Sequence, residues 1–299
     1  MKYDNDKTTH HICGDIEYLT FNKLDKYMDK ISYGIFLKKG GVSTGIYNSL
    51  NFRLLGNDNK DNIFCNVEKA TKILNISNIY KACQTHSDNI LVLNNQNKDK
   101  YEVHKLNGEE FDSYIHKENN IASLITTADC TPVIIYDTKN NIIANVHSGW
   151  AGTLKKIALK TAIKMHDEFN SNYEELILCL GPSIQKCCFT TEDETFANQF
   201  PGFTMEKNYI TEKNKNNSEN NNKNSNKNSN KNLNYKNIYH MDLPKIIKQD
   251  FLDLGVKESN IILSNICTCC NSDDFYSYRK FKKQGYEDYA TFGTITMIK

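Results

Sequence analysis

The sequence lacks any long apolar run, and this absence excludes the integral membrane classes. A transmembrane helix needs about 18 or more consecutive apolar residues, and no stretch of the chain approaches that length. The first residues, Met1 to Lys7, are polar, and no apolar run follows them, so we expect no secretory signal. We therefore expect a cytoplasmic protein without a membrane partner.

The sequence also lacks an excess of charge of either sign. The formal net charge is +1 at pH 7, from 37 basic and 36 acidic residues. Proteins that bind nucleic acid usually carry a clustered basic excess, so we expect no nucleic-acid partner. Ten cysteines are present, but in a cytosolic chain of 299 residues we expect reduced thiols, not a disulfide framework.

One Cys-x-x-Cys motif, from Cys267 to Cys270, lacks a second such pair at zinc spacing. The strong zinc signature needs two pairs. Cys187 and Cys188 could complete a set, but nothing in the sequence brings them to the motif. Because small thiols pack well in ordinary cores, we expect Cys267, Cys270 and the intervening Cys269 to be ordinary reduced side chains.

What the sequence does contain is three metal-type side chains, each at the end of a strand-like run. His86, Cys130 and His147 lie 44 and then 17 residues apart, so only a folded scaffold could bring them together. Two imidazoles and one thiolate suit zinc and leave one tetrahedral position open, as catalytic sites do. A single histidine or cysteine is more often a packed structural residue, and spacing alone leaves both interpretations open.

Several short motifs occur in a characteristic order. They are Lys-Gly-Gly-Val-Ser-Thr-Gly-Ile-Tyr-Asn-Ser-Leu-Asn at 39–51, Gln-Thr-His at 84–86, Thr-Ala-Asp-Cys at 127–130, His-Ser-Gly-Trp at 147–150, Gly-Pro-Ser-Ile at 181–184, Cys-Thr at 267–268 and Phe-Tyr-Ser-Tyr-Arg at 275–279. In order and spacing they resemble the YfiH-like laccase-domain family, from about Phe36 to Ile298. Members of that family are known as polyphenol oxidases and as zinc-dependent purine nucleoside phosphorylases.

The resemblance implies a ligand set and a reaction. His86, Cys130 and His147 match the metal triad of the family, so one zinc per chain is the implied cofactor, with copper as the alternative. The implied substrates are purine nucleosides and phosphate. Inosine or adenosine would be cleaved to free base and ribose 1-phosphate, with adenosine deamination as a side activity. Whether the protein is a monomer or a homodimer stays open.

Polar residues in the same motifs are candidates for the chemistry. Asp129 could orient a ligand or handle a proton, and capping of a turn is its structural alternative. Arg53 could hold an anion during catalysis because a guanidinium binds phosphate through a fork, although it could equally pair with a surface carboxylate. The residues predicted to bind substrate are Ser43, Asn51, Gln84 and Arg279.

Three other functions fit part of this pattern. A copper polyphenol oxidase would need paired His-x-His motifs, and the eight histidines include none. A cysteine hydrolase would use Cys130 as nucleophile and His147 as base, but a thiolate tied to zinc is a poor free nucleophile. A non-catalytic zinc- and nucleoside-binding module is the third, because Ala151 and Thr294 stand where the family usually has basic residues.

The periodicities predict an α+β fold, a mixed-sheet α/β sandwich. The resemblance implies the YfiH-like type, with a single domain at 31–299 after an N-terminal segment at 1–30. Strands are predicted at 33–37, 79–84, 90–93, 122–126, 133–137, 142–147, 176–180, 261–264 and 294–298, and helices at 62–74, 153–170, 193–199 and 243–254. The start of the second helix is expected near His147, where its free N–H groups could bind phosphate. A disordered insertion is expected at about 212–237, which is almost all Asn, Lys and Ser.

Overall fold

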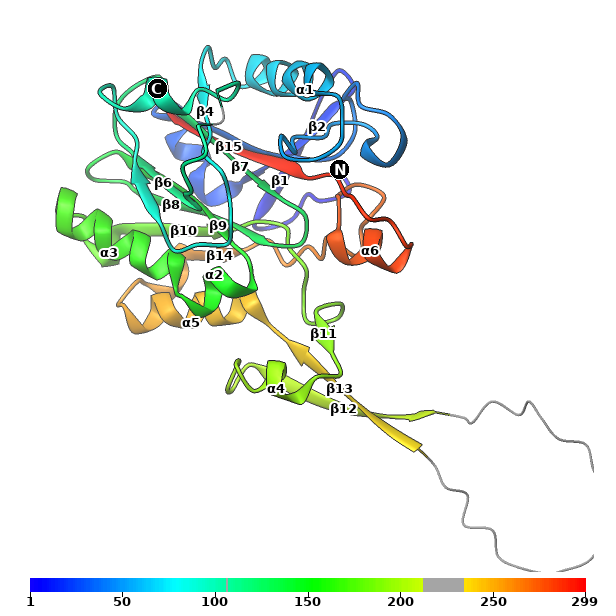
Figure 1. Ribbon diagram of the computed structural model, residues 1–299. Helices are drawn as coiled ribbons and strands as arrows, with labels where there is room; N and C mark the ends of the chain where they lie inside the picture. The colour runs from blue at the N-terminus through cyan, green and yellow to red at the C-terminus, as the bar shows by residue number, and fades with distance from the viewer. Residues whose placement is uncertain (106, 212–233) are drawn as a thin grey trace, which may run out of the picture.

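The computed structural model describes residues 1–105, 107–211 and 234–299 (Figure 1). The strands are β1 (Thr8–Cys13), β2 (Ile16–Phe21), β3 (Ile31–Phe36), β4 (Ile79–Tyr80), β5 (Ile90–Val92), β6 (Ser113–His116), β7 (Ala122–Thr127), β8 (Thr131–Asp137), β9 (Ile142–Ser148), β10 (Leu176–Leu180), β11 (Thr190–Thr191), β12 (Thr204–Thr211), β13 (Asn234–Met241), β14 (Ile261–Leu263) and β15 (Phe292–Ile298). The α-helices are α1 (Lys60–Ile73), α2 (Trp150–Leu154), α3 (Ile157–Phe169), α4 (Glu194–Ala197), α5 (Leu243–Asp253) and α6 (Tyr278–Lys283).

Two large mixed sheets form the centre of the molecule. Their strand orders are β1-β2-β3-β15-β7-β4 and β14-β10-β8-β9-β6-β5, and a small third sheet has the order β11-β13-β12. Most neighbours are antiparallel, but β4 runs parallel to β7, β5 to β6, and β14 to β10. Helix α1 lies outside the first sheet, and α3 and α5 lie outside the second (Figure 1). The predicted mixed-sheet α/β sandwich is confirmed.

Side-chain alternation along the strands explains the layers. In β8, Ile134 and Tyr136 join the core between the two sheets, whereas Val133 and Ile135 join the core under α3 and α5. Successive side chains of a strand point to opposite faces, so a strand buried on both faces reads as a continuous apolar run. Strands of this kind end where the chain turns polar, and residues at those strand ends form the candidate site.

The helix predicted at 153–170 is two helices. Lys156 has a left-handed backbone, with φ of 60°, which separates the five-residue α2 from α3. A helix dipole depends on many aligned peptides, so α2 is too short to provide the phosphate-binding helix end that the sequence predicted beside His147. Helix α5 begins as predicted, with Asp242 accepting a hydrogen bond from the backbone N–H of Lys245.

Two segments that were predicted to lie apart from the fold supply strands to it. Residues 1–30, set apart as a segment, supply β1 and β2 to the same sheet as β3. Most of the insertion predicted at 212–237 lies outside the described residues, and 234–237 belong to β13. The β12–β13 pair extends away from the two large sheets (Figure 1). Among the described residues, no helix combines the length and apolar character needed to cross a membrane.

Candidate active site

The three predicted ligands meet at one end of the sandwich. The ligand atoms of His86, Cys130 and His147 all lie within 4.8 Å of one another, and Cys130 Sγ is 3.5 Å from His86 Nε2. Strand register explains part of this convergence. In the β8–β9 pair, Thr131 faces Ser148 and Pro132 faces His147, so Cys130, just before β8, arrives beside the end of β9.

Asp112 connects the two histidines of this triad. Its Oδ1 is 2.6 Å from His147 Nδ1, and its Oδ2 accepts hydrogen bonds from the backbone N–H and the hydroxyl of Ser87, both at 2.7 Å. The backbone N–H of His86 also donates to Asp112, at 3.2 Å. A carboxylate that accepts from one ring nitrogen leaves the other nitrogen free for a metal and fixes the ring orientation. Asp112 therefore stabilises the conformation of the loop that contains His86 and fixes the orientation of the His147 ring.

Gly149 leaves the space that the triad needs. A Cβ atom at this position would lie 2.5 Å from His86 Cδ2 and 2.9 Å from Cys130 Sγ. Such distances are shorter than van der Waals contacts, so any side chain here would displace the ligand atoms. The His-Ser-Gly motif thus contains a predicted ligand, His147, and a glycine whose backbone must lie close to the other two predicted ligands. A borderline-soft ion such as zinc accepts this set of two imidazole nitrogens and one sulfur, and the triad fits it.

The electrostatics of the triad favour a thiolate. Burial alone would raise the pKa of the Cys130 thiol, but His147 and His86 lower it to about 6. For His147, burial acts to lower the pKa, while Cys130 and Asp112 raise it to about 9. Burial likewise acts against the charge of Asp112, and hydrogen bonds from His147 and Ser87 lower its pKa to about 2. Thiolate sulfur is the form of cysteine that binds metals.

Asp129 precedes the predicted ligand Cys130 in an unusual backbone conformation, with φ of 88°. One carboxylate oxygen accepts a hydrogen bond from the Thr268 hydroxyl at 2.6 Å, and the other accepts from the Arg279 backbone N–H at 2.7 Å. Burial raises the pKa of Asp129, and these hydrogen bonds act in the opposite direction. The carboxylate therefore fixes the turn that presents Cys130; a proton-handling role stays a prediction.

The triad lies in the wall of a cavity of about 650 Å³. This volume is typical of sites for small organic molecules. The other predicted site residues that line the cavity are Arg53, Gln84, Asp129 and Arg279. Apolar side chains with unusual exposure gather there: Leu55 is 62% exposed, Trp150 43% and Tyr278 44%. Exposed apolar surface concentrated in a concave site points to a ligand that covers it.

The guanidinium groups of the two arginines contact different kinds of acceptor. The Arg53 guanidinium pairs with Asp288 and stacks 3.9 Å above the Tyr289 ring, so its charge is offset. Arg279 Nη1 instead donates to the carbonyl oxygens of Cys188, at 2.9 Å, and Thr190, at 3.1 Å. Carbonyls are neutral acceptors, so these contacts do not offset the charge of Arg279, which lines the cavity and has the buried Asp129 carboxyl as a charged neighbour.

Ser43 and Asn51 do not line the cavity. The Ser43 hydroxyl and the Asn51 side-chain amide both donate to Asp58 Oδ2, at 2.6 and 2.8 Å. Asn51 Oδ1 accepts from the backbone N–H groups of Arg53 and Thr291, both at 3.0 Å. Asn51 thereby positions two segments of the cavity wall. Direct contact of Ser43 or Asn51 with substrate stays a prediction.

Two site residues have no counterpart among the sequence predictions. Asp112 comes just before β6, a strand that the sequence analysis did not predict, so its meeting with His147 had no visible signal. Lys81 lines the cavity although it is almost fully buried, and its ammonium donates to Gln84 Oε1. Burial lowers the pKa of Lys81 to about 8. Charged residues are rarely buried unless paired, so the burial of Lys81 marks it as a candidate functional residue. This burial is visible in the structure and not in the sequence.

The chain is similar to several known proteins over most of its length. A purine nucleoside phosphorylase of Bacteroides thetaiotaomicron is 28% identical over 90% of this chain and 93% of the relative. One from Clostridium acetobutylicum is 31% identical over 88% and 94%. The crystal structure of a Bacillus licheniformis hypothetical protein, YfiH, superposes with a TM-score of 0.78 at 20% identity, covering 97% of this chain and 99% of that one. The family described as multi-copper polyphenol oxidoreductase laccase matches residues 32–292, and the chain belongs to that family.

Proposed function

We propose that the protein is a zinc-dependent purine nucleoside phosphorylase that cleaves inosine or adenosine with phosphate. The observation that carries this proposal is the position of the His86–Cys130–His147 triad, an incomplete tetrahedral ligand set in the wall of a nucleoside-sized cavity. The names of the two bacterial relatives support the same reaction.

The cavity wall offers a separate surface to each part of the substrates. Trp150 and Tyr278 present exposed aromatic surface on which a purine can stack, and Phe196 packs edge-on against Trp150 at 5.2 Å between ring centroids. Arg279 offers positive charge for phosphate, whose oxygens a guanidinium binds through a fork. Lys81, whose ammonium donates to Gln84, is a second cation for an anionic group in the cavity.

The triad and its supports would hold zinc and keep it oriented. A zinc ion bound by His86, Cys130 and His147 would supply Lewis acidity to an oxygen of the substrates. Asp112 keeps Nδ1 of His147 hydrogen-bonded so that Nε2 faces the centre. Asp129 fixes the turn that presents Cys130 and, through its bond to the Arg279 backbone, links the metal centre to the anion-binding side of the cavity.

We expect base release from inosine and adenosine to require phosphate. Protein purified without added metal and then assayed with each nucleoside should form free base and ribose 1-phosphate in equal amounts only when phosphate is present. Chromatography of the products checks this, and on adenosine it also detects inosine, the product of deamination. Equal base release with and without phosphate would mean hydrolysis and would contradict the proposal.

Arg279→Gln is expected to weaken phosphate use more than nucleoside use. The loss of one charge-assisted contact corresponds to about 10-fold or more in the apparent KM for phosphate, with a smaller change in the KM for inosine. Arg53→Gln is the matched comparison, because Asp288 already offsets the charge of Arg53. Steady-state kinetics at varied phosphate measure both. A larger phosphate defect in Arg53→Gln would transfer the anion-binding role to Arg53.

The copper oxidase alternative lacks the ligands that it needs. In the part of the chain that the structure describes, the two groups of metal-type side chains contain only two histidines, His86 and His147. Multicopper oxidation requires a mononuclear copper and a trinuclear cluster, and imidazole is the ligand that suits copper(II). The cysteine hydrolase alternative keeps one supporting observation, the contact between Cys130 and His86 at 3.5 Å with His147 beside them. The phosphate-dependence assay separates it from phosphorolysis.

A further inference from the structure

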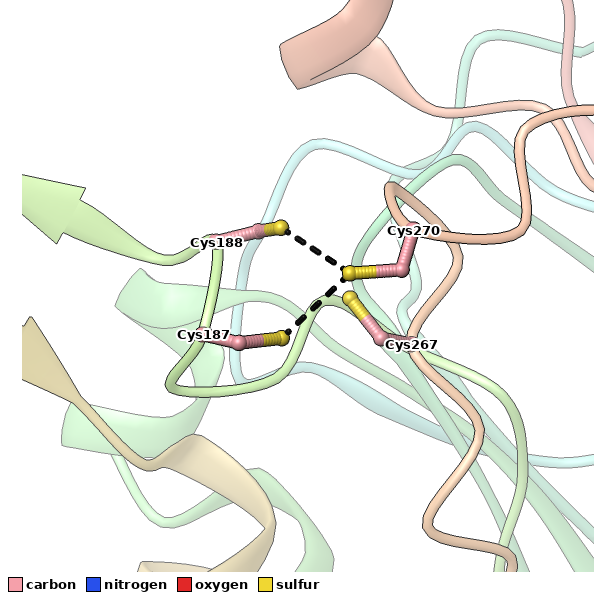
Figure 2. A group of neighbouring side chains, drawn as sticks. All are labelled: Cys187, Cys188, Cys267 and Cys270. Atoms are coloured by element: carbon pink, nitrogen blue, oxygen red, sulfur yellow. Dashed lines mark hydrogen bonds between the residues drawn. The ribbon is translucent and has the colours of Figure 1, made fainter.

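Four cysteines from two distant segments converge outside the candidate active site. Cys187 and Cys188 follow β10, and Cys267 and Cys270 follow β14. Their sulfur atoms all lie within 4.8 Å of one another, with Cys270 Sγ 3.6 Å from that of Cys187 and 3.4 Å from that of Cys188. Figure 2 shows the four side chains pointing toward a common centre from the two loops.

The sulfur spacing matches a single tetrahedral ion. With Zn–S bonds of about 2.3 Å, the sulfurs of a tetrahedral tetrathiolate lie about 3.8 Å apart. The two sulfur separations to Cys270 are within a few tenths of an ångström of that edge. In an iron–sulfur cluster, iron and sulfide atoms lie between the cysteines and hold the sulfurs farther apart, so a mononuclear site fits better. All four cysteines are free thiols, not disulfides.

Burial gives a second, independent indication. Cys187 and Cys270 are exposed, Cys188 is intermediate and Cys267 is buried. Unbound cysteine is among the most buried residue types because its thiol behaves as a small apolar group. Exposed thiols that converge from two loops are therefore unusual as packing residues and expected of a metal site at the surface.

We propose that Cys187, Cys188, Cys267 and Cys270 bind one zinc ion in a closed structural site, separate from the His86–Cys130–His147 centre. Closed four-ligand sites hold folded segments together and leave no position for substrate. This replaces the expectation from the sequence that the Cys-x-x-Cys motif consists of ordinary thiols, because the fold supplies the missing second pair.

The backbone around the four cysteines shows what the ion would fasten. Ser183 and Cys267 form an isolated parallel bridge, in which the Ser183 N–H donates to the Ile266 carbonyl and the Thr268 N–H to the Ser183 carbonyl, both at 3.1 Å. This short pairing and the four cysteines join the loops beyond β10 and β14. A metal crosslink would therefore extend a brief backbone contact into a rigid junction.

That junction is connected to the active site on both sides. Thr268, between two of the ligands, donates its hydroxyl to Asp129. The carbonyl of Cys188 accepts from the Arg279 guanidinium. Zinc at the four cysteines would thus hold the two groups that position the Cys130 turn and the cavity arginine. The site acts through structure and takes no part in the reaction itself.

Thiol protection in the wild-type protein tests the proposal directly. The protein, purified under reducing conditions without added metal, is treated with iodoacetamide before and after a strong chelator, and each cysteine is quantified by peptide mass spectrometry. We expect Cys187 and Cys270 to react at least about 10-fold faster after chelation, since zinc-bound thiolates are shielded. Cys13, which is exposed on β1, should react equally in both samples. Equal reactivity of all the exposed cysteines in both samples would overturn the proposal.

Elemental analysis of three variants assigns the ion. The double variant Cys267→Ser/Cys270→Ser should lose one zinc per chain relative to wild type, and Cys130→Ser should lose the other one. Cys269→Ser is the matched control, because this cysteine lies in the same loop but its sulfur is not part of the group of four. Unchanged zinc in the double variant, loss of zinc in Cys269→Ser, or iron in place of zinc would each contradict the assignment. If the double variant does not fold, the protection experiment on wild type still decides.

Discussion

Cys130→Ser protein is expected to fold but to lack the active-site metal and to show no measurable phosphorolysis. A serine hydroxyl stays protonated near neutral pH and is a poor ligand, so two imidazoles alone would remain. The loss of activity should exceed the ~100-fold cost that removing a supporting residue can have. Metal content per chain by elemental analysis and inosine cleavage at saturating phosphate measure the two effects.

Cys13→Ser is a suitable control, because it makes the same chemical change at an exposed position on β1. The melting temperature of both variants establishes that the fold is intact. Normal turnover by Cys130→Ser with its active-site metal absent would contradict a metal-dependent mechanism. Complete inactivity with full metal content would instead support Cys130 as a nucleophile.

Asp112→Asn should lower metal affinity by about 10- to 100-fold, the range found when a residue that supports a metal ligand is replaced. The carboxylate is fully buried and accepts hydrogen bonds from His147, Ser87 and the backbone of His86. Asparagine keeps the size but not the charge, and its amide can offer an N–H where His147 Nδ1 needs an acceptor. The ring would then turn or change tautomer, and Nε2 would bind metal less well.

A competition titration with a chromophoric chelator measures this affinity, with Asp88→Asn as the control. Asp88 is also an aspartate near the His86 loop, but it pairs with Lys160 at 2.5 Å on the surface. A surface ion pair contributes little, so Asp88→Asn should bind metal like wild type. Equal affinities for the two variants would show that Asp112 has a structural role only.

The sequence predicted those parts of the fold that are encoded by local patterns. Apolar runs located β7 and β9 because both strands are almost entirely buried, and the polar residues at their ends located Cys130 and His147. Asp112 could not be found in this way, since its partner is 35 residues away and its strand, β6, has only four residues. Sequence patterns show which side chains can bind metal, whereas pairing between distant strands decides which carboxylate supports them.

The break between α2 and α3 shows the same limit in a helix. The apolar spacing from Leu154 to Met165 fits one continuous helix, and nothing local signals that Lys156 adopts a left-handed backbone. Helix α2 follows β9 directly after Gly149, whose backbone lies against His86 and Cys130. The cysteine pairs follow the same principle. Cys187 and Cys188 lie 83 and 82 residues from Cys270, and the parallel pairing of β10 with β14 brings the two loops together.

The contribution of β1 and β2 to the first sheet has a consequence for where the folding unit begins. The region matched by the family starts at residue 32, inside β3. A chain that began at residue 32 would leave β3 as an edge strand beside β15, with unsatisfied N–H and C=O groups where β2 pairs and an apolar flank that Leu19 and Phe21 now cover. Exposed edges of this kind pair with other chains and promote aggregation. The residues before the family motifs therefore cover the apolar flank of β3 and move the edge of the sheet to β1.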